Sequence, residues 1–155
     1  MNDTKEKNQV EGALIESGIM QSTVFADLNQ SLGKIFSTLD TSKEENSKTL
    51  FNVLNSVGTE KLEDYLGKEI KLANFIIQKY DGTDEVTGEV TSNNKVVLID
   101  DKGTCYATGS KGIFNSLIKL ISAFGMPANW KAPKVIKAIE KPLDGGRKTY
   151  IIELI

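Results

Sequence analysis

The side chains able to do chemistry in this 155-residue sequence are aromatic rings set among lysines and arginines. Tyr106, Trp130 and Tyr150 each lie within a few residues of a cation, and Phe75 and Tyr80 share one candidate strand with lysines. Flat rings stack on nucleic-acid bases, while cations bind phosphates and displace their counterions. The pattern indicates non-covalent contact with a nucleic acid, although every one of these rings also suits a buried core.

The sequence lacks the residues of most reaction centres. It has a single cysteine and no histidine. The absence of histidine removes the commonest general base and the commonest metal ligand. The run 145–148 lacks the leading glycine and the Ser/Thr of a phosphate loop, so we interpret it as a turn. Asp100 and Asp101 adjoin in a turn, where solvated aspartates are commoner than cation ligands. We therefore expect no enzyme activity, no catalytic residue, no metal and no cofactor.

The stretch 95–125 organises the rest of the chain. Its apolar, β-branched run 96–99 predicts a strand, Gly103 closes a turn, and residues 104–108 predict a second strand. Ser110 stands where a helix N-cap belongs, and Gly125 with Pro127 ends the helix. Between them, apolar residues recur at helical spacing. They are Ile113, Phe114, Leu117, Ile118, Leu120, Ile121 and Phe124.

Further strands are expected at 68–80, 134–140 and 149–155, with a polar loop at 81–94. The order of strand, strand, strand, helix, strand, strand is that of the oligonucleotide/oligosaccharide-binding (OB) barrel. We predict an α+β fold: a five-stranded OB-like β-barrel with one helix between strands 3 and 4, preceded by an N-terminal helical arm. Other α+β folds share this order.

The N-terminal part has a different character. Residues 1–21 predict an arm or frayed helix. Apolar residues from Phe25 to Leu39 recur at alternating spacings of three and four residues, which predicts a helix over 22–39. Ser42 and Glu45 resemble the capping pair of a second helix that ends at Gly58. Residues 1–66 carry 6 basic and 11 acidic residues, whereas 111–155 carry 8 and 3. We predict two domains: 1–66, an N-terminal helical arm or assembly segment, and 67–155, an OB-like domain that binds single-stranded nucleic acid.

Several segments together resemble the single-stranded DNA-binding proteins of phages and mobile elements of Gram-positive bacteria. They are Tyr65–Ile70, Thr87–Val90, Val97–Asp100, Gly103–Ala107 and Ser110–Leu117. The resemblance covers roughly residue 50 to 155, and its motifs are spacing and core signatures. It implies a protein that coats exposed strands during replication, without chemistry and without strong sequence preference.

The candidate binding residues combine rings and cations of the second domain. They are Lys71, Phe75, Lys102, Tyr106, Lys111, Trp130, Lys131, Lys134, Arg147, Lys148 and Tyr150. We assign Phe114 and Phe124 to the core, because they share the helix stripe with aliphatic residues. The loop 81–94 should repel phosphate through its acidic side chains, so the basic loop 141–148 is the better ligand loop.

Two functions remain open at this point. The first is a non-enzymatic single-stranded DNA-binding protein, with RNA as an open second ligand, that forms a homo-oligomer through its N-terminal helices and meets replication proteins. The second is a phage or plasmid protein–protein module, either a structural subunit or a host-factor inhibitor, that acts through its acidic helices. We expect no membrane partner and a location in the cytoplasm of the bacterial host.

Overall fold

The computed structural model describes residues 33–155, of which 35–155 form one compact unit. The arm predicted at 1–21 and the first part of the helix predicted at 22–39 lie outside these residues. In the described part no helix is long and apolar enough to cross a membrane. No cluster of metal-ligating side chains occurs there either.

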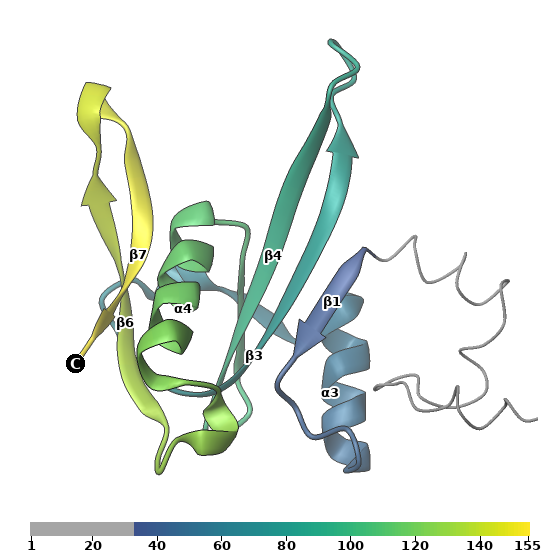
Figure 1. Cartoon of the computed structure of the whole chain (residues 1–155), viewed down its shortest axis with the longest axis vertical. Helices are drawn as coiled ribbons and strands as arrows, with labels where there is room; N and C mark the ends of the chain where they lie inside the picture. Colours follow the sequence, from purple (N-terminus) through teal and green to yellow (C-terminus); the bar gives the residue numbers. More distant parts are fainter. Residues whose placement is uncertain (1–32) are drawn as a thin grey trace, which may run out of the picture. The chain divides into compact units, whose positions relative to one another are not determined.

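One curled, open sheet forms the framework (Figure 1). Its strands are β1 (Lys34–Ser37), β2 (Thr59–Lys61), β3 (Glu69–Thr83), β4 (Val90–Asp100), β5 (Cys105–Thr108), β6 (Lys134–Pro142) and β7 (Lys148–Leu154). Their order is β2-β5-β4-β3-β6-β7, and β1 pairs with β3. Each predicted strand corresponds to one strand from β3 to β7, and the α+β class is confirmed. The strand count of five is wrong, because the short strands β1 and β2 add to the sheet.

The helix predicted between the third and fourth strands is confirmed as α4 (Lys111–Phe124). Ser110 is its N-cap, and the Ser110 side chain accepts a hydrogen bond from the Ile113 N–H at 3.2 Å. α4 runs beside β7, where the Ser116 hydroxyl accepts a hydrogen bond from the Ile152 N–H at 3.1 Å. The helix therefore covers the outer edge of β7.

Side chains on the two faces of the sheet form two cores. On one face α4 buries Ile113 and Leu117 against β3, β4 and β6. On the other face Val53 of α3 (Glu44–Leu54) packs on Ile76, Val97 and Ile99. The alternation of side chains along β3 and β4 supplies both cores from the same strands. The described residues also form three short 3-10 turns: η3 (Leu62–Tyr65), η4 (Pro127–Asn129) and η5 (Asp144–Gly146).

Two predicted elements are wrong. Residues 34–37 form strand β1, which pairs with β3, where a helix was predicted, and Gly33 before them has a φ of 77°. The loop predicted at 81–94 is largely strand: β3 and β4 stay paired from Tyr80↔Asn93 to Thr83↔Val90. Both faces of this ribbon are polar, so it lacks the apolar alternation that marks a strand.

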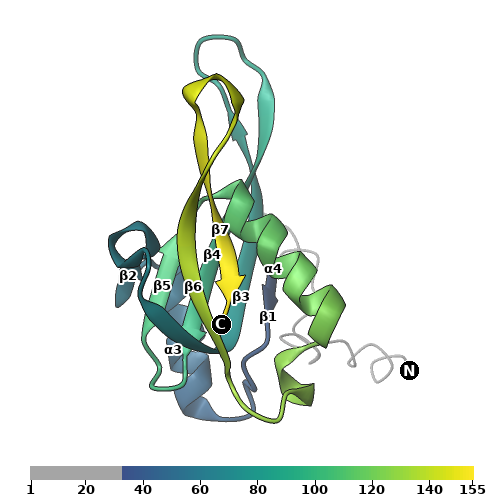
Figure 2. The ribbon, with the colours of Figure 1, turned by 90° about the vertical axis from the view of Figure 1, so that its left-hand side faces the viewer.

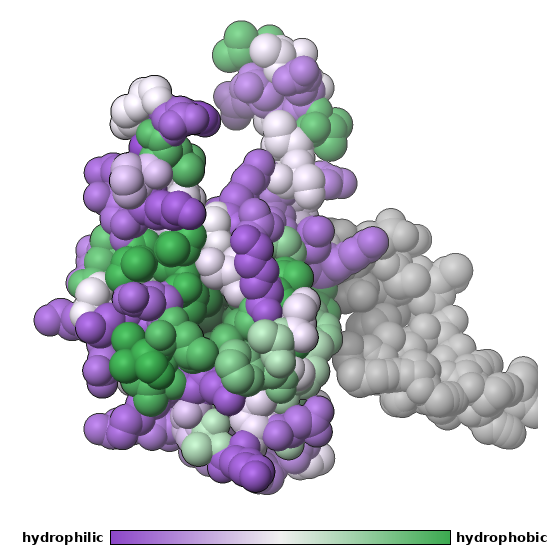
Figure 3. Space-filling model, turned by 60° about the vertical axis from the view of Figure 1, so that its left-hand side comes forward, coloured by the Kyte–Doolittle hydropathy of each residue, from purple (hydrophilic) through white to green (hydrophobic). Residues whose placement is uncertain are grey.

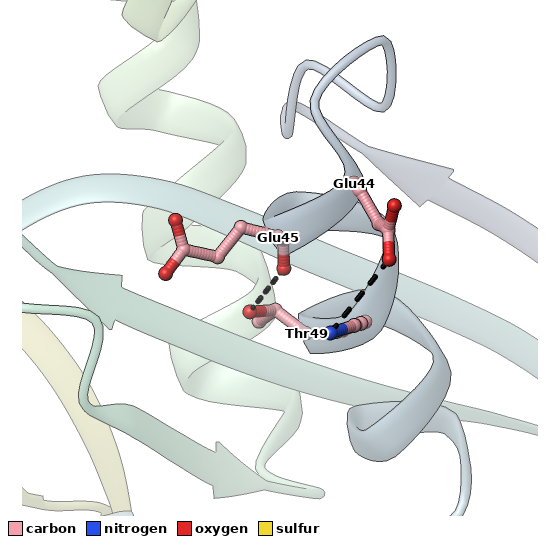
Figure 4. A network of polar contacts seen from close by, with 4 residues as sticks. Glu44, Glu45 and Thr49 are labelled. Carbon is pink, nitrogen blue, oxygen red and sulfur yellow. Dashed lines mark hydrogen bonds and ion pairs between the residues drawn. The ribbon is translucent and has the colours of Figure 1, made fainter.

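The second predicted helix is confirmed as α3, but the capping pair is wrong. Ser42 donates its N–H and its hydroxyl to the Asp40 carboxylate, which lowers the pKa of Asp40. Figure 4 shows the first turn, where the Thr49 hydroxyl donates to the Glu45 carbonyl and Lys48 pairs with Glu44 at 3.7 Å. After α3, residues 59–61 form β2 and residues 62–65 form η3.

Lys95 holds the end of α3 against the sheet. Its ammonium donates to the Val53 carbonyl at 3.0 Å and to the Ser56 hydroxyl at 2.9 Å, and partial burial lowers the pKa of Lys95. Replacing Lys95 by methionine keeps the apolar stem and removes both hydrogen bonds. We expect the free energy of unfolding to fall by about 1 kcal/mol. Denaturant unfolding measures this, and Lys43→Met, at the exposed start of α3, should leave stability unchanged.

Candidate nucleic-acid interface

Two hairpins project from the body of the protein in the same direction (Figures 1 and 2). The acidic finger, residues 80–93, is the tip of the β3–β4 ribbon, and the basic finger, residues 140–149, is the tip of β6–β7. The space-filling view shows an open notch between the fingers and apolar side chains gathered on the body below (Figure 3). The start of α4 lies near the base of the notch.

The side chains around the base of the notch combine cations and rings. The Lys79 ammonium lies 5.4 Å from the centre of the Phe114 ring, and Lys111 is exposed in the first turn of α4. Tyr150 of β7 is half-buried on the α4 side of the sheet. α4 approaches β7 closely here, since a Cβ atom added to Gly112 would overlap the Tyr150 carbonyl oxygen. The notch therefore has a firmly packed base.

A second group of rings and cations lies at the C-terminal end of α4. The Lys134 ammonium is 4.1 Å from the centre of the Phe124 ring and 5.7 Å from that of Trp130. The Trp130 indole N–H donates to the Gly125 carbonyl at 3.0 Å, which fixes the indole. Lys131 is exposed beside it. The structure thus brings three predicted site residues together: Trp130, Lys131 and Lys134.

Phe124 belongs to this group and was assigned to the core from the sequence. Its side chain is 43% exposed, because it occupies the last helical position before Gly125, where the chain leaves the sheet. The apolar stripe of the helix gave no sign of this. Its position one residue before the helix stop was the one signal available.

The basic finger carries Arg147 and Lys148, as predicted. Lys148 pairs with Glu140 across the hairpin at 3.1 Å, and this hydrogen bond raises the pKa of Lys148. The Arg147 Nε donates to the Asp144 carbonyl at 3.3 Å, while Lys141 is exposed. The side chains of Arg147 and Lys148 are both exposed at the surface of the finger.

Two predicted rings lie in the core. Phe75 is fully buried, with its ring centre 6.0 Å from that of Phe36. Tyr106 is buried, stacks edge-on against Tyr65 at 5.0 Å and directs its hydroxyl at Asp100. Burial raises the pKa of Tyr106. A base has no access to either ring in this structure. We therefore no longer count Phe75 and Tyr106 among the candidate binding residues.

Two predicted cations lie away from the α4 side. Lys71 stands between the buried Ile70 and Leu72, which face α4, so Lys71 points to the opposite face of the sheet. Lys102 lies in the turn between β4 and β5, and its N–H donates to the Asp100 carboxylate at 2.9 Å. The remaining predicted cations follow one side of the sheet, from the basic finger along α4.

The sequence is similar to known proteins over most of its length. The family model described as phage single-stranded DNA-binding protein matches residues 29–154. The single-stranded DNA-binding protein of Bacillus phage GA-1 is 29% identical over 96 residues, which cover 59% of this chain and 56% of that relative. The match therefore spans little more than half the length of the relative. No solved structure matches the chain.

Proposed function

Because the chain belongs to the phage single-stranded DNA-binding protein family, we propose that it coats single-stranded DNA during phage or mobile-element replication without any enzymatic step. The strand lies on the α4 side of the sheet, against the basic finger and along the helix. Family membership over residues 29–154 is the observation that carries this proposal. The clustering of cations with exposed or half-buried rings on that side supports it.

The arrangement suits an unpaired strand. α4 has 14 residues, which corresponds to about 21 Å of length, enough for a few nucleotides. Lys111 and Lys119 are exposed along it, and rings lie near both of its ends. Cations that track a backbone and rings that stack on bases give affinity without reading sequence. No reacting group and no cofactor enters this mechanism.

The proposal also assigns roles to the two parts of the chain, a location and further partners. DNA binding is assigned to residues 67–155, as an OB-like domain, and association of copies into a homo-oligomer to residues 1–66, of which 35–66 also pack in the compact unit. The protein works in the cytoplasm of the bacterial host, next to other replication proteins. RNA is a second ligand to be compared with DNA, because stacking and phosphate contacts are available from either.

Fluorescence of Trp130 tests the function directly, since it is the only tryptophan. We expect quenching on addition of oligo-dT, with an affinity that falls steeply as salt rises. Oligomers of graded length, in DNA and RNA, define the site size and the ligand preference. Unchanged fluorescence together with unchanged mobility in a gel shift would overturn strand coating and favour the protein–protein module.

Phe124→Ala tests the stacking group at the end of α4. A base stacked on an aromatic ring contributes roughly 1–3 kcal/mol, so the affinity for oligo-dT should fall about tenfold. Ile118→Ala is the matched control, because Ile118 is 42% exposed on the same helix and has no ring. Equal affinities of the two variants would show that Phe124 makes no base contact.

A further inference from the structure

We propose that the acidic finger excludes duplex DNA, so that its carboxylates determine the preference for an unpaired strand. This inference rests on the proposed function and adds a specificity element to it. The finger is the conspicuous feature of the structure that strand coating leaves without a role. Its side chains have the wrong charge to bind phosphate, yet it stands opposite the basic finger across the notch (Figure 3).

The charge of the finger is dense and one-sided. Residues 81–90 contain four carboxylates and no lysine or arginine. They are Asp81, Asp84, Glu85 and Glu89. Asp81 follows Lys79 at a spacing of two along β3, so it lies on the face of the ribbon that Lys79 directs towards α4. At least one carboxylate therefore borders the notch itself, and the others surround the tip.

The hydrogen bonds at the tip keep the finger in shape and charged. The Asp84 carboxylate accepts from the N–H groups of Val86 and Thr87 at 2.8 and 3.0 Å. The hydrogen bond from Thr87, and after it that from Val86, lowers the pKa of Asp84. The Asp84 N–H donates to the Glu89 carbonyl at 2.8 Å and closes the turn. The strands below are paired up to Thr83↔Val90, so the carboxylates are held on a continuous ribbon.

A duplex meets this finger in a way that a single strand does not. A strand seated against the basic finger and α4 places its phosphates near cations and its bases near rings. A complementary strand would add a second phosphate backbone beyond those bases, on the side of the acidic finger. Duplex DNA carries one charge per about 1.7 Å of axis, so several phosphates would come within a Debye length of the carboxylates. The resulting repulsion acts on the duplex more than on the single strand.

The test removes charge and preserves shape. The finger variant combines Asp81→Asn, Glu85→Gln and Glu89→Gln, and leaves Asp84 to hold the turn. The control variant combines Glu44→Gln, Glu45→Gln and Asp101→Asn, which changes the net charge equally on α3 and on the β4–β5 turn. The dissociation constants of oligo-dT and of a duplex of equal length are measured by fluorescence anisotropy, with the DNA labelled, at about 50 and about 500 mM salt.

We expect the preference for oligo-dT over duplex to fall about tenfold in the finger variant at low salt and to stay unchanged at high salt. The control variant should shift both affinities equally and keep the wild-type preference. An unchanged preference in the finger variant, or an equal loss in both variants, would overturn the inference while strand binding stands. Failure of the wild-type protein to bind oligo-dT would overturn the proposed function and this inference with it.

Discussion

Replacing Gly112 by alanine is expected to lower the free energy of unfolding by about 3 kcal/mol, because the added methyl group has no space. A Cβ at this position would overlap the Tyr150 carbonyl oxygen and the Thr149 hydroxyl. The carbonyl belongs to the backbone of β7, so the clash is relieved only if α4 and β7 move apart. That movement would also strain the hydrogen bond from the Ile152 N–H to the Ser116 hydroxyl.

Thermal unfolding measures the effect, and a loss of this size corresponds to a fall in Tm of roughly 10 °C for a domain of this length. Gly109→Ala is the matched control, since its Cβ would meet only the Asn94 carbonyl, at 3.7 Å, which is an ordinary contact. Equal Tm values for the two alanine variants would show that α4 does not pack on β7 as closely as described.

Replacing Lys111, Lys134 and Arg147 together by alanine is expected to weaken binding of oligo-dT severely. Each phosphate contact to a single strand adds about 0.7 to the steepness of log affinity against log salt. Losing three contacts should therefore make this dependence shallower by about 2. If the two proteins bind equally at about 1 M salt, a slope difference of about 2 over this roughly 20-fold range makes the variant a few hundredfold weaker than wild type at about 50 mM. The three residues mark the start of α4, its end and the basic finger.

The triple Lys43→Ala, Lys48→Ala, Lys61→Ala has the same change in net charge and serves as the control. Its lysines lie beside and on α3 and on β2, away from the proposed strand path. Titrations at several salt concentrations give both slopes. A control slope reduced as much as that of the first triple would place the strand elsewhere on the protein, or show that net charge alone governs binding.

The sequence predicted the centre of the fold well because its patterns there are strong. The segment 95–125 has β-branched runs, a glycine turn, a serine cap and a helical apolar stripe, and each of these reports a local preference. The strand β1 was missed for the opposite reason. Ile35 and Leu39 fit a helical spacing with apolar residues before Gly33, and only the pairing of Thr38 with Phe75 of β3 makes this segment extended. Tertiary contact overrode the local pattern.

The candidate site was predicted less completely, because exposure depends on packing. Phe75 and Phe124 are alike in the sequence as rings on apolar stripes, yet one is fully buried and the other is 43% exposed. The difference arises from position: Phe75 lies mid-strand beneath α4, and Phe124 ends the helix beyond the sheet. Most of the predicted cations lie on β6, β7 and α4, which pack together, so they fall on one side of the sheet.

The open sheet has one last consequence, which concerns the proposed coating of a strand by many copies of the protein. Exposed strand edges on neighbouring copies could join by backbone pairing, which leads to aggregation. Here the strand at one end of the order, β2, is only three residues long and carries Glu60 and Lys61, while the strand at the other end, β7, has its edge covered by α4. Both ends of the sheet are thus poor templates for a further strand. We therefore expect these two ends of the sheet to resist backbone pairing between copies that lie close together on a strand.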